Sequence, residues 1–336
     1  MTHRAYVVSS LGPPHAHRVQ DVPTPSPTGS EVLISVEAAG VNYPDTLLLR
    51  GRYQFTPSLP FTPGSEACGT IAAVGPDVTS HAVGDRVIAR TPTGAFSEKL
   101  LVPEDSVLPL PAGMSPAEGA ALCLAHGTAL YALRRVAQLR RGETLLVLGA
   151  AGGVGLAACE LGRLLGARVV GCASTGEKLA ACAAKGAEVL LQYGPEAGER
   201  EKRRLRDELR ELGGVDVCVD PVGGEWSELA IRAMAWGGRY LVVGFAAGSI
   251  PRVPLNLPLL KGCSLMGVFW GSWCAREPAA AAEDFALLAK WHAEGSLRPL
   301  CSQTFELARA ADALALIEQR GACGKVCLLM QNRSKL

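Results

Sequence analysis

A run of small residues with free backbone amides is the clearest candidate for chemistry in this sequence. Residues 149–155 read Gly-Ala-Ala-Gly-Gly-Val-Gly, after the apolar segment 145–148 and before the helical segment 154–166. Small residues let the backbone approach a pyrophosphate, and the free N–H groups at a helix N-terminus meet its charge. A strand, this turn and a helix in that order predict a dinucleotide-binding turn. The residues expected to face the ligand are Ala151, Gly152, Gly153, Val154 and Gly155.

One position departs from the usual dinucleotide fingerprint. Ala150 stands where the fingerprint has its first glycine. The alternative interpretation of the whole run is therefore an ordinary glycine-rich turn.

The end of the second apolar segment bears on the choice between NADH and NADPH. An NAD site of this kind has an acidic residue about 20 positions after the turn, where it binds the ribose 2′-hydroxyl. This chain has Ser174 and Lys178 there, a hydroxyl and a cation that suit a 2′-phosphate. The sequence therefore predicts NADPH. Glu177 leaves NADH open, and a plain surface position is the alternative for Lys178.

From about residue 125 the chain alternates short apolar segments with helical ones. The expected strands are 145–148, 168–171, 188–191, 215–219 and 240–243. The expected helices are 154–166, 176–186, 199–213 and 225–236. Strands that are buried on both faces and alternate with helices predict an α/β domain with a doubly wound, Rossmann-type parallel sheet.

The regions on either side of this alternation have a different pattern. Within the first hundred residues, short apolar runs such as 32–36 and 69–74 lie between turns rich in proline and glycine, which predicts a small barrel-like β domain. Near the other end we expect a sixth strand at 264–269, a helix at 279–294 and a last strand at 324–329.

Composition limits the classes of function. The 336 residues suit two domains, and 33 basic against 32 acidic residues provide no field that would attract nucleic acid or an anionic membrane. The 11 cysteines include no C-x-x-C pair, which favours a reducing compartment over a disulfide framework or a zinc finger. We find no signal core, transit segment or membrane-length apolar stretch, so the expected location is the cytoplasm.

Longer motifs along the whole chain resemble those of a known superfamily. The chain is similar to the medium-chain dehydrogenases/reductases and, within them, to the zinc-free quinone oxidoreductases. Three further motifs, 236–239, 243–245 and 267–271, resemble the quinone oxidoreductase-like protein 2 branch. The motifs that carry the superfamily resemblance are Ala-Ala-Gly-Val-Asn-Tyr-Pro-Asp at 38–45, Pro-Phe-Thr-Pro-Gly-Ser-Glu at 60–66, Val-Gly-Asp-Arg-Val at 83–87, the glycine-rich turn, and Asp-Pro-Val-Gly-Gly at 220–224.

The resemblance also bears on zinc. The zinc-dependent relatives carry a cysteine where this chain has Asn42, and a histidine where it has Ser65. Asparagine is a poor zinc ligand and serine is not a usual one. We therefore expect no metal site.

The fold implied by the resemblance has two parts. Residues 1–124 would form a GroES-like β-barrel domain for substrate and catalysis, completed by the C-terminal segment 262–336. Residues 125–261 would form the NADP-binding Rossmann domain. The sixth strand, an apolar edge without proline, would pair with its twin in a homodimer.

Three residues are expected to act near the reacting atoms. The resemblance puts Asn42 beside the nicotinamide ribose or carboxamide, as a neutral donor in place of the metal ligand. Tyr53 matches a tyrosine of the substrate cleft that would orient a carbonyl or supply a proton. Thr128 matches a hydroxyl near the nicotinamide. The alternatives are a turn-shaping role for Asn42, edge packing for Tyr53 and helix capping for Thr128.

The remaining candidates line the cofactor or the substrate pocket. By resemblance Tyr193 packs near the adenosine 2′-phosphate, although plain packing at a strand end is the alternative. Gly244 and Phe245 follow the fifth strand, at the sheet edge where wound sheets bind ligands. Phe269 and Trp270 would wall the pocket near the nicotinamide, or belong to the core or the dimer interface.

The main hypothesis is a zinc-independent, NADPH-dependent oxidoreductase that reduces quinones or related conjugated carbonyls by hydride transfer. A 2-alkenal or enone double-bond reductase is the nearest alternative. A non-catalytic NADPH-binding protein, crystallin-like or RNA-binding, is the alternative of another class. A Ser-His-Asp hydrolase is disfavoured because the chain has no G-x-S-x-G motif, and His126 is expected to be only a local hydrogen-bond partner.

Overall fold

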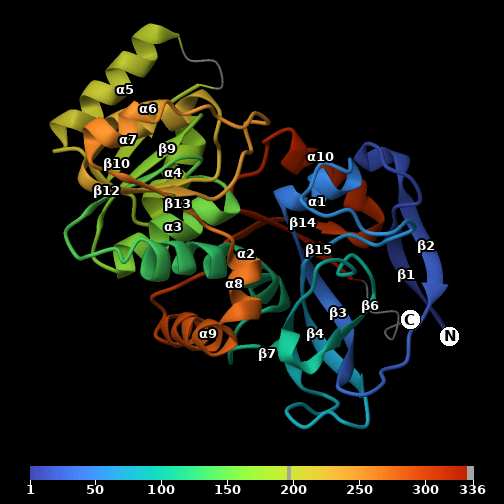
Figure 1. Ribbon diagram of the computed structural model, residues 1–336. Coiled ribbons are helices and arrows are strands. Elements are labelled where there is room, and N and C mark those ends of the chain that lie inside the picture. Colours follow the sequence, from blue (N-terminus) through green and yellow to red (C-terminus); the bar gives the residue numbers. More distant parts are fainter. Residues whose placement is uncertain (195–197, 331–336) are drawn as a thin grey trace. The chain divides into compact units, whose positions relative to one another are not determined.

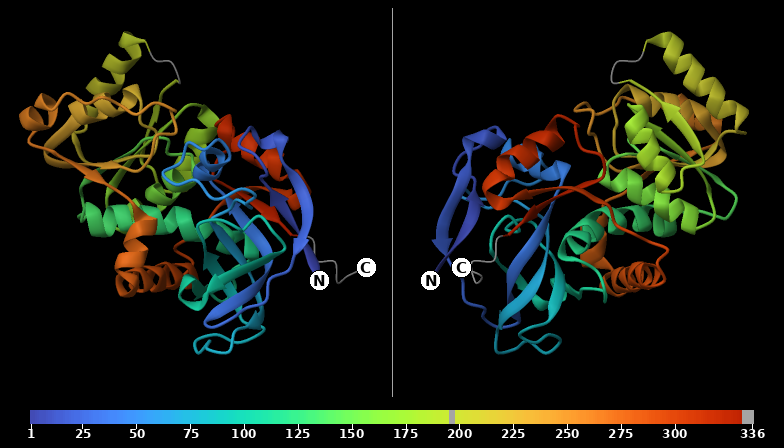
Figure 2. Two further views of the ribbon diagram at one scale, coloured as in Figure 1. Left: turned by 45° about the vertical axis from the view of Figure 1, so that its right-hand side comes forward. Right: turned by 180° about the vertical axis from the view of Figure 1, so that it is seen from behind.

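The computed structural model describes residues 1–194 and 198–330, which fall into two compact units (Figure 1, Figure 2). The first unit comprises Met1–Leu124 and the chain from Arg298 onward, and the second comprises Ala125–Leu297. The first boundary lies where the sequence pattern predicts it. The chain returns to the first unit at Arg298, and not at residue 262.

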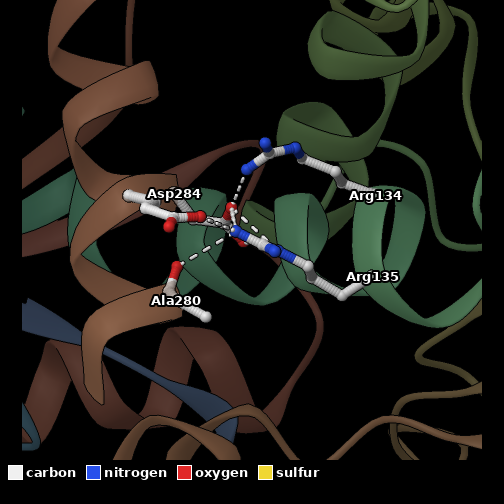
Figure 3. A network of polar contacts seen from close by, with 5 residues as sticks. Arg134, Arg135, Ala280 and Asp284 are labelled. Carbon is white, nitrogen blue, oxygen red and sulfur yellow. Dashed lines mark hydrogen bonds and ion pairs between the residues drawn. The ribbon is translucent and has the colours of Figure 1, made fainter. Parts of the chain in front are cut away.

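The later return has a structural reason. Strand β13 (Ser264–Gly267) is paired with β12 (Met234–Val242), and helix α9 (Pro278–Ala293) is held by an ion-pair network within the second unit (Figure 3). The buried carboxylate of Asp284 on α9 accepts hydrogen bonds from Arg134 and from Arg135, whose Nη2 lies 2.8 Å from Oδ1. The Nη2 group of Arg135 also donates to the carbonyl of Ala280 at 3.3 Å. These contacts fasten both elements to the wound domain.

The first unit is a β domain built from both ends of the chain. Its main sheet has the strand order β14-β15-β3-β4-β5-β7, with β6 paired to β3, and β1 and β2 form a separate hairpin. Strand β15 lies antiparallel to β3, so the C-terminal segment completes the sheet. The strands are β1 (Thr2–Val7), β2 (Arg18–Pro23), β3 (Glu31–Val41), β4 (Glu66–Val74), β5 (Arg86–Arg90), β6 (Lys99–Pro103), β7 (Val107–Pro109), β14 (Cys301–Glu306) and β15 (Lys325–Leu329).

Helices α1 (Tyr43–Leu49) and α10 (Ala310–Glu318) cover the core of this unit. The core gathers the apolar side chains of β3, β4 and β15 with those of both helices. Three single turns of 3-10 helix, η1 (Pro14–Ala16), η2 (Glu104–Ser106) and η4 (Leu307–Arg309), connect the strands. The GroES-like β domain expected from the sequence is confirmed.

The second unit contains a six-stranded sheet in which every neighbouring pair is parallel. Its strand order is β10-β9-β8-β11-β12-β13, the arrangement 3-2-1-4-5-6 of a dinucleotide-binding domain. The four strands not yet given are β8 (Thr144–Val147), β9 (Arg168–Ala173), β10 (Val189–Gln192) and β11 (Val215–Asp220). This confirms the Rossmann-type sheet and all six of its expected strands.

Helices cover both faces of that sheet. Helices α3 (Gly153–Leu164) and α4 (Gly176–Ala184) pack against β8, β9 and β10. Helices α5 (Glu199–Glu211), α6 (Glu225–Ala233) and α7 (Asn256–Lys261) share a core cluster with strands β8 to β12. In α5 the leucines at 205 and 209 are fully buried while the charged residues face outward, as the mixed-charge pattern of an amphipathic helix requires.

Three details differ from the sequence expectation. The helix expected over 225–236 ends at Ala233, because Met234 takes an extended conformation and pairs with Val215 in the sheet. Helix α2 (Pro116–Leu130) continues into a π-helical turn, η3 (Tyr131–Val136). The sixth strand ends at Gly267, and a further helix, α8 (Trp270–Arg276), follows it.

The helices also bear on membrane insertion. Within residues 1–194 and 198–330, none of them combines the length and the apolar character that crossing a bilayer would require.

Candidate functional site

The turn between β8 and α3 has the backbone that the sequence predicts for a phosphate cradle. Gly152, which has no side chain to cap the helix, is the N-cap of α3, and the first turn of that helix contains no acidic residue. The amides of the first helical turn therefore remain available to an anion. A Cβ at Gly155 would lie 2.3 Å from the carbonyl oxygen of Gly149, so only glycine allows the helix to pack this closely on the strand.

Ala150, the departure from the usual fingerprint, is part of the core. Its side chain is fully buried, and its N–H donates to the carbonyl of Cys172 on β9 at 2.9 Å. The methyl group of Ala150 therefore faces the sheet. Ala151 and Gly152 remain on the side of the turn where the ligand is expected.

The region after β9 carries the residues expected to select the phosphorylated cofactor. Thr175 is the N-cap of α4, and its side chain accepts a hydrogen bond from the N–H of Lys178 at 3.3 Å. Ser174 and Lys178 are partly exposed, and Glu177 is exposed in the first turn. A hydroxyl, a helix N-terminus and an ammonium thus lie within five consecutive residues.

Tyr193 lies at the end of β10 and touches the cradle. Its phenolic oxygen accepts a hydrogen bond from the N–H of Gly149 at 3.0 Å, and its ring packs edge-on against Trp226 at 4.5 Å. The side chain is buried. The residue therefore joins the third strand to the first residue of the turn, which is more than packing at a strand end.

Asp220 at the end of β11 is a residue of the site region to which the sequence pattern assigned no role. Its buried carboxylate accepts hydrogen bonds from the N–H groups of Val222 and Gly223 at 2.7 and 2.8 Å, from Ser227 Oγ at 2.7 Å, and from the hydroxyl of Tyr240. Burial, followed by the negative charge of Asp220, raises the pKa of Tyr240, so its hydroxyl stays protonated and donates. This network fixes the loop after β11.

Gly244 and Phe245 follow β12 and lie against that loop. The nearest backbone to a Cβ on Gly244 would be Pro221 at 3.4 Å, and a Cβ on Gly223 would meet the Phe245 ring at 2.9 Å. Both Gly244 and Phe245 are partly buried. They therefore occupy the carboxyl edge of the parallel sheet, as their place in the sequence predicts.

Three of the residues expected near the nicotinamide, Thr128, Phe269 and Trp270, belong to the second unit, on or next to α2 and α8. Thr128 is buried inside α2, two residues before its end, so the alternative of an N-terminal cap does not apply. Beside it, a Cβ at Gly127 would lie 2.5 Å from Cζ2 of Trp270. Trp270 thus packs closely on α2. The preceding residue, Phe269, is the N-cap of α8, and it is 59% exposed.

His126 belongs to a separate buried network. Its Nε2 lies 3.3 Å from Glu160 Oε2, and the other carboxylate oxygen accepts from Lys185 Nζ at 3.0 Å. His126 is 4% exposed. It is a local hydrogen-bond partner between helices, as expected.

In the first unit, Asn42 lies in a buried polar cluster with Glu66 and Lys325. Its amide nitrogen donates to Glu66 Oε1 at 2.9 Å and to the carbonyl of Gly40 at 3.2 Å. Its amide oxygen accepts from the ammonium of Lys325, which also donates to Glu66 Oε1 at 2.5 Å. The second carboxylate oxygen of Glu66 accepts from the N–H of Leu124 at 2.7 Å.

This cluster fixes which way the Asn42 amide points. A lysine ammonium has only donors and a carboxylate has only acceptors, so the amide oxygen must face Lys325 and the amide nitrogen must face Glu66. Both N–H groups of the amide are then used, and its oxygen accepts from Lys325. The expected role of Asn42 beside the nicotinamide stays a prediction.

Asp45 and Tyr53 lie close to this cluster. Asp45 is fully buried and accepts hydrogen bonds from the N–H groups of Asn42 at 2.8 Å and Gly64 at 3.2 Å. Burial raises the pKa of Asp45 to about 7, although those hydrogen bonds and the charge of Lys325 lower it. Tyr53 is partly buried against the core, and burial, followed by the charge of Asp45, raises its pKa. Its hydroxyl is therefore a neutral donor.

Comparisons with known proteins agree with this architecture. Family models match at residues 28–112, described as alcohol dehydrogenase GroES-like domain, and at residues 153–289, described as zinc-binding dehydrogenase. A quinone oxidoreductase-like protein 2 from Mus musculus is 35% identical over 318 residues, which cover 93% of this chain and 89% of the relative. The chain belongs to the quinone oxidoreductase family. This confirms the membership that the motifs indicated, within the medium-chain dehydrogenases/reductases.

Solved structures resemble the chain over nearly its whole length. The quinone oxidoreductase from Thermus thermophilus, determined also in complex with NADPH, is 34% identical with a TM-score of 0.83, covering 97% of this chain and 99% of that one. The CurK enoyl reductase is 25% identical with a TM-score of 0.86, covering 98% and 99%. Both the quinone reductase and the enoyl reductase thus share the fold.

The description of one family model as zinc-binding raises the question whether this chain's residues fit zinc. They do not, because the ammonium of Lys325 lies between Asn42 and Glu66, and a lysine ammonium repels a cation and offers it no lone pair. Throughout the part of the chain that the structure describes, no three side chains of His, Cys, Asp or Glu gather as a metal site would need.

Proposed function

We propose that this protein is a zinc-independent, NADPH-dependent reductase of quinones or related conjugated carbonyls. The observation that carries the proposal is the cradle that begins at Gly152, together with Ser174 directly after β9 and Lys178 near the start of α4. The quinone oxidoreductase from Thermus thermophilus, determined with NADPH, supports the choice of cofactor and of substrate class.

When bound, NADPH supplies the hydride, and the chain supplies binding, orientation and control of protons. The amides of 153–155 would hold the pyrophosphate, and Ser174 and Lys178 the 2′-phosphate. Tyr193 keeps the turn in place through the N–H of Gly149. Gly244, Phe245, Phe269 and Trp270 would border the cofactor, as the carboxyl edge of the sheet favours.

Asn42, Tyr53 and Thr128 are the proposed residues near the reacting atoms. The Asn42 amide would contact the carboxamide or a ribose hydroxyl of the nicotinamide, and so orient the ring. The neutral hydroxyl of Tyr53 would donate to the quinone oxygen that becomes negative as the hydride arrives. Thr128 offers a second hydroxyl for the nicotinamide. Water is the proposed source of the proton.

Two measurements test this function. Titration of the intrinsic tryptophan fluorescence should give a lower dissociation constant for NADPH than for NADH. NADPH oxidation should accelerate with an ortho-quinone. Equal affinities would contradict the assignment of Ser174 and Lys178, and absence of binding would contradict an enzyme of this kind.

A double-bond reductase of alkenals or enones is the second candidate. The likeness to the CurK enoyl reductase favours it, because that protein shares the fold over nearly the whole chain. The same NADPH assay with a short alkenal separates the two. A rate on the alkenal together with no rate on the quinone above background would favour the second candidate.

We also propose a homodimer. Strand β13 is the last strand of its sheet, with Leu265 exposed on it and Leu259 and Leu260 exposed on the neighbouring α7. An exposed apolar edge strand presents unpaired backbone groups that favour pairing with another strand. A second copy of the chain would provide an identical strand for that pairing. Light scattering after gel filtration should give twice the chain mass, and Leu265→Lys should lower it. A monomer in the unchanged protein would contradict this proposal.

The proposed compartment is the cytoplasm. The cysteines are free thiols, and most are buried among apolar side chains, which suits a reducing environment. Fluorescence microscopy of a tagged chain in its cell of origin tests the proposal, and a signal confined to another compartment would contradict it.

A further inference from the structure

A buried carboxylate, that of Glu160, joins three helices of the second unit. Glu160 lies on α3, and its Oε2 is 3.3 Å from Nε2 of His126 on α2. Its Oε1 accepts a hydrogen bond from Nζ of Lys185, the C-cap residue of α4, at 3.0 Å. The side chains of His126, Glu160 and Lys185 are only 5%, 6% and 12% exposed. Each of the two carboxylate oxygens therefore contacts a residue of a different neighbouring helix.

The contact with Glu160 fixes the imidazole of His126. An ionised carboxylate has only acceptors, so Nε2 is the ring nitrogen that carries a proton and donates. The other ring nitrogen, Nδ1, is buried and has no hydrogen-bond partner among the residues that the structure describes. Within that part of the chain, Glu160 is thus the polar partner that orients the ring.

The same three helices carry proposed contacts to the cofactor. The first turn of α3 belongs to the pyrophosphate cradle. Helix α4 begins just after Ser174 and contains Lys178, the two proposed contacts of the 2′-phosphate. Thr128, proposed beside the nicotinamide, lies on α2 two residues after His126. Because a helix is a stiff element, a contact in its middle or at its end also determines where its other residues lie.

Stability alone does not account for this buried network. Replacing a buried ion pair by apolar side chains of similar volume is often neutral or stabilising, because the charges lose their hydration on burial. What the hydrogen bonds add is direction, since each requires a donor and an acceptor at a defined distance and angle. Glu160 therefore supplies a fixed geometry between α2, α3 and α4.

We propose that Glu160 is a positioning residue for the dinucleotide, which sets the spacing of the three helices through Lys185 and His126. The link to Lys185 fixes the 2′-phosphate site relative to the pyrophosphate cradle. The link to His126 fixes the nicotinamide site relative to the same cradle. This inference rests on the proposed function, and it adds that the two links act on opposite ends of the cofactor. Each link can therefore be cut separately.

The link to α2 is cut by His126→Phe, which keeps a buried ring and leaves the ion pair of Glu160 and Lys185 intact. The nicotinamide end should be misplaced, so we expect kcat for quinone reduction by NADPH to fall about 10-fold. Adenosine 2′,5′-bisphosphate has no nicotinamide, and its Kd in a fluorescence titration should change by less than about twofold. His126→Gln, whose amide restores an N–H donor, should recover most of kcat.

The link to α4 is cut by Lys185→Met in the background of Glu160→Gln, so that no unpaired charge is left buried. The amide oxygen of the new side chain can still accept from His126. The Kd of adenosine 2′,5′-bisphosphate should rise about 10-fold, because its two phosphates need α3 and α4 at the right spacing. Lys290→Met is the matched control, since it removes a positive charge whose partner, Glu294, follows it within four residues. It should change that Kd by less than about twofold.

The outcomes separate this inference from the proposed function. Binding and turnover of NADPH by the unchanged protein, with an unaltered kcat in His126→Phe or an unaltered bisphosphate Kd in the double variant, would overturn the role of Glu160 and leave the proposed function standing. Equal effects on kcat and on the bisphosphate Kd in His126→Phe would also overturn it, because they would indicate a general loosening of the unit. Absence of NADPH binding in the unchanged protein would overturn both.

Discussion

The ammonium of Lys325 lies 2.5 Å from Glu66 Oε1, and the side chains of both residues are at most 5% exposed. A buried ion pair of this kind is costly to break from one side, because the remaining charge stays in a medium that solvates it poorly. We predict that Lys325→Met lowers the free energy of unfolding by about 3–5 kcal/mol, measured by urea denaturation.

The double variant Glu66→Gln, Lys325→Met is the control for that prediction. It removes both charges and should recover a large part of the lost free energy of unfolding, since no uncompensated charge remains. Equal losses in the single and the double variant would contradict the view that the unpaired carboxylate causes the loss.

Asn42 should matter more for turnover than for cofactor affinity. The proposed contacts to the pyrophosphate and the 2′-phosphate come from the second unit, and Asn42 belongs to the first. We predict that Asn42→Ala lowers kcat by about 10- to 100-fold, because it removes a polar contact that orients the ring. The dissociation constant of NADPH should change by less than about threefold.

Stability has to be measured beside those kinetics, since Asn42→Ala also removes hydrogen bonds to Lys325 and Glu66. We expect a loss of about 1–3 kcal/mol in the free energy of unfolding, which leaves the chain folded at assay temperature. An unchanged kcat in a folded variant would remove Asn42 from the proposed site.

Asp45 should make the stability of the protein depend on pH. Burial raises its pKa from an ordinary value of 3.8 to about 7 in the folded chain. Between these values the folded state binds more protons than the unfolded state, so the contribution of Asp45 to stability is lost as pH rises through about 7. One such group gives a slope of at most about 1.4 kcal/mol per pH unit.

Asp45→Asn removes this titration and is the reference for it. The free energy of unfolding, measured from pH 5 to pH 9, should fall for the unchanged protein relative to the variant up to about pH 7 and then run parallel. Parallel curves across the whole range would mean that Asp45 titrates at the same pH in both states.

Lys178 should discriminate between the two nicotinamide cofactors. A charge-assisted hydrogen bond to a phosphate is worth about 1.5–3 kcal/mol, so Lys178→Ala should weaken NADPH about 10- to 100-fold and NADH by less than about threefold. Lys290→Ala, which removes an exposed positive charge on α9 of the same unit, is the matched control. Equal weakening of both cofactors in Lys178→Ala, or of NADPH in both variants, would contradict a specific contact.

The wound sheet could be predicted from the sequence because its strands carry their own signal. Continuous apolar runs such as 145–148 and 215–219 coincide with β8 and β11, since parallel strands are buried on both faces. The return of the chain at Arg298 had no such signal. It depends on Asp284, whose partners Arg134 and Arg135 lie about 150 residues earlier in the sequence.

Long-range pairing also explains what was missed in the site. Asn42 was found through its motif, but Lys325 is separated from Glu66 by 259 positions and reaches it only because β15 lies beside β3. The signal in the sequence is a lysine at the start of the apolar run 325–329, a run that by itself predicts only a strand. A charged residue in a buried strand requires a partner, and the sequence does not say which one.

Gly127 and Trp270 allow a test of the packing between α2 and α8. Alanine is favoured over glycine inside a helix by about 1 kcal/mol, but a Cβ at position 127 would lie 2.5 Å from the indole. Overpacking of this kind costs about 1–3 kcal/mol, so Gly127→Ala alone should destabilise the protein. In the background of Trp270→Ala the same substitution should stabilise it, because the clash is gone and the helix preference remains. Urea denaturation of the four proteins gives the coupling free energy directly. The same sign of effect in both backgrounds would show that Trp270 does not rest on Gly127.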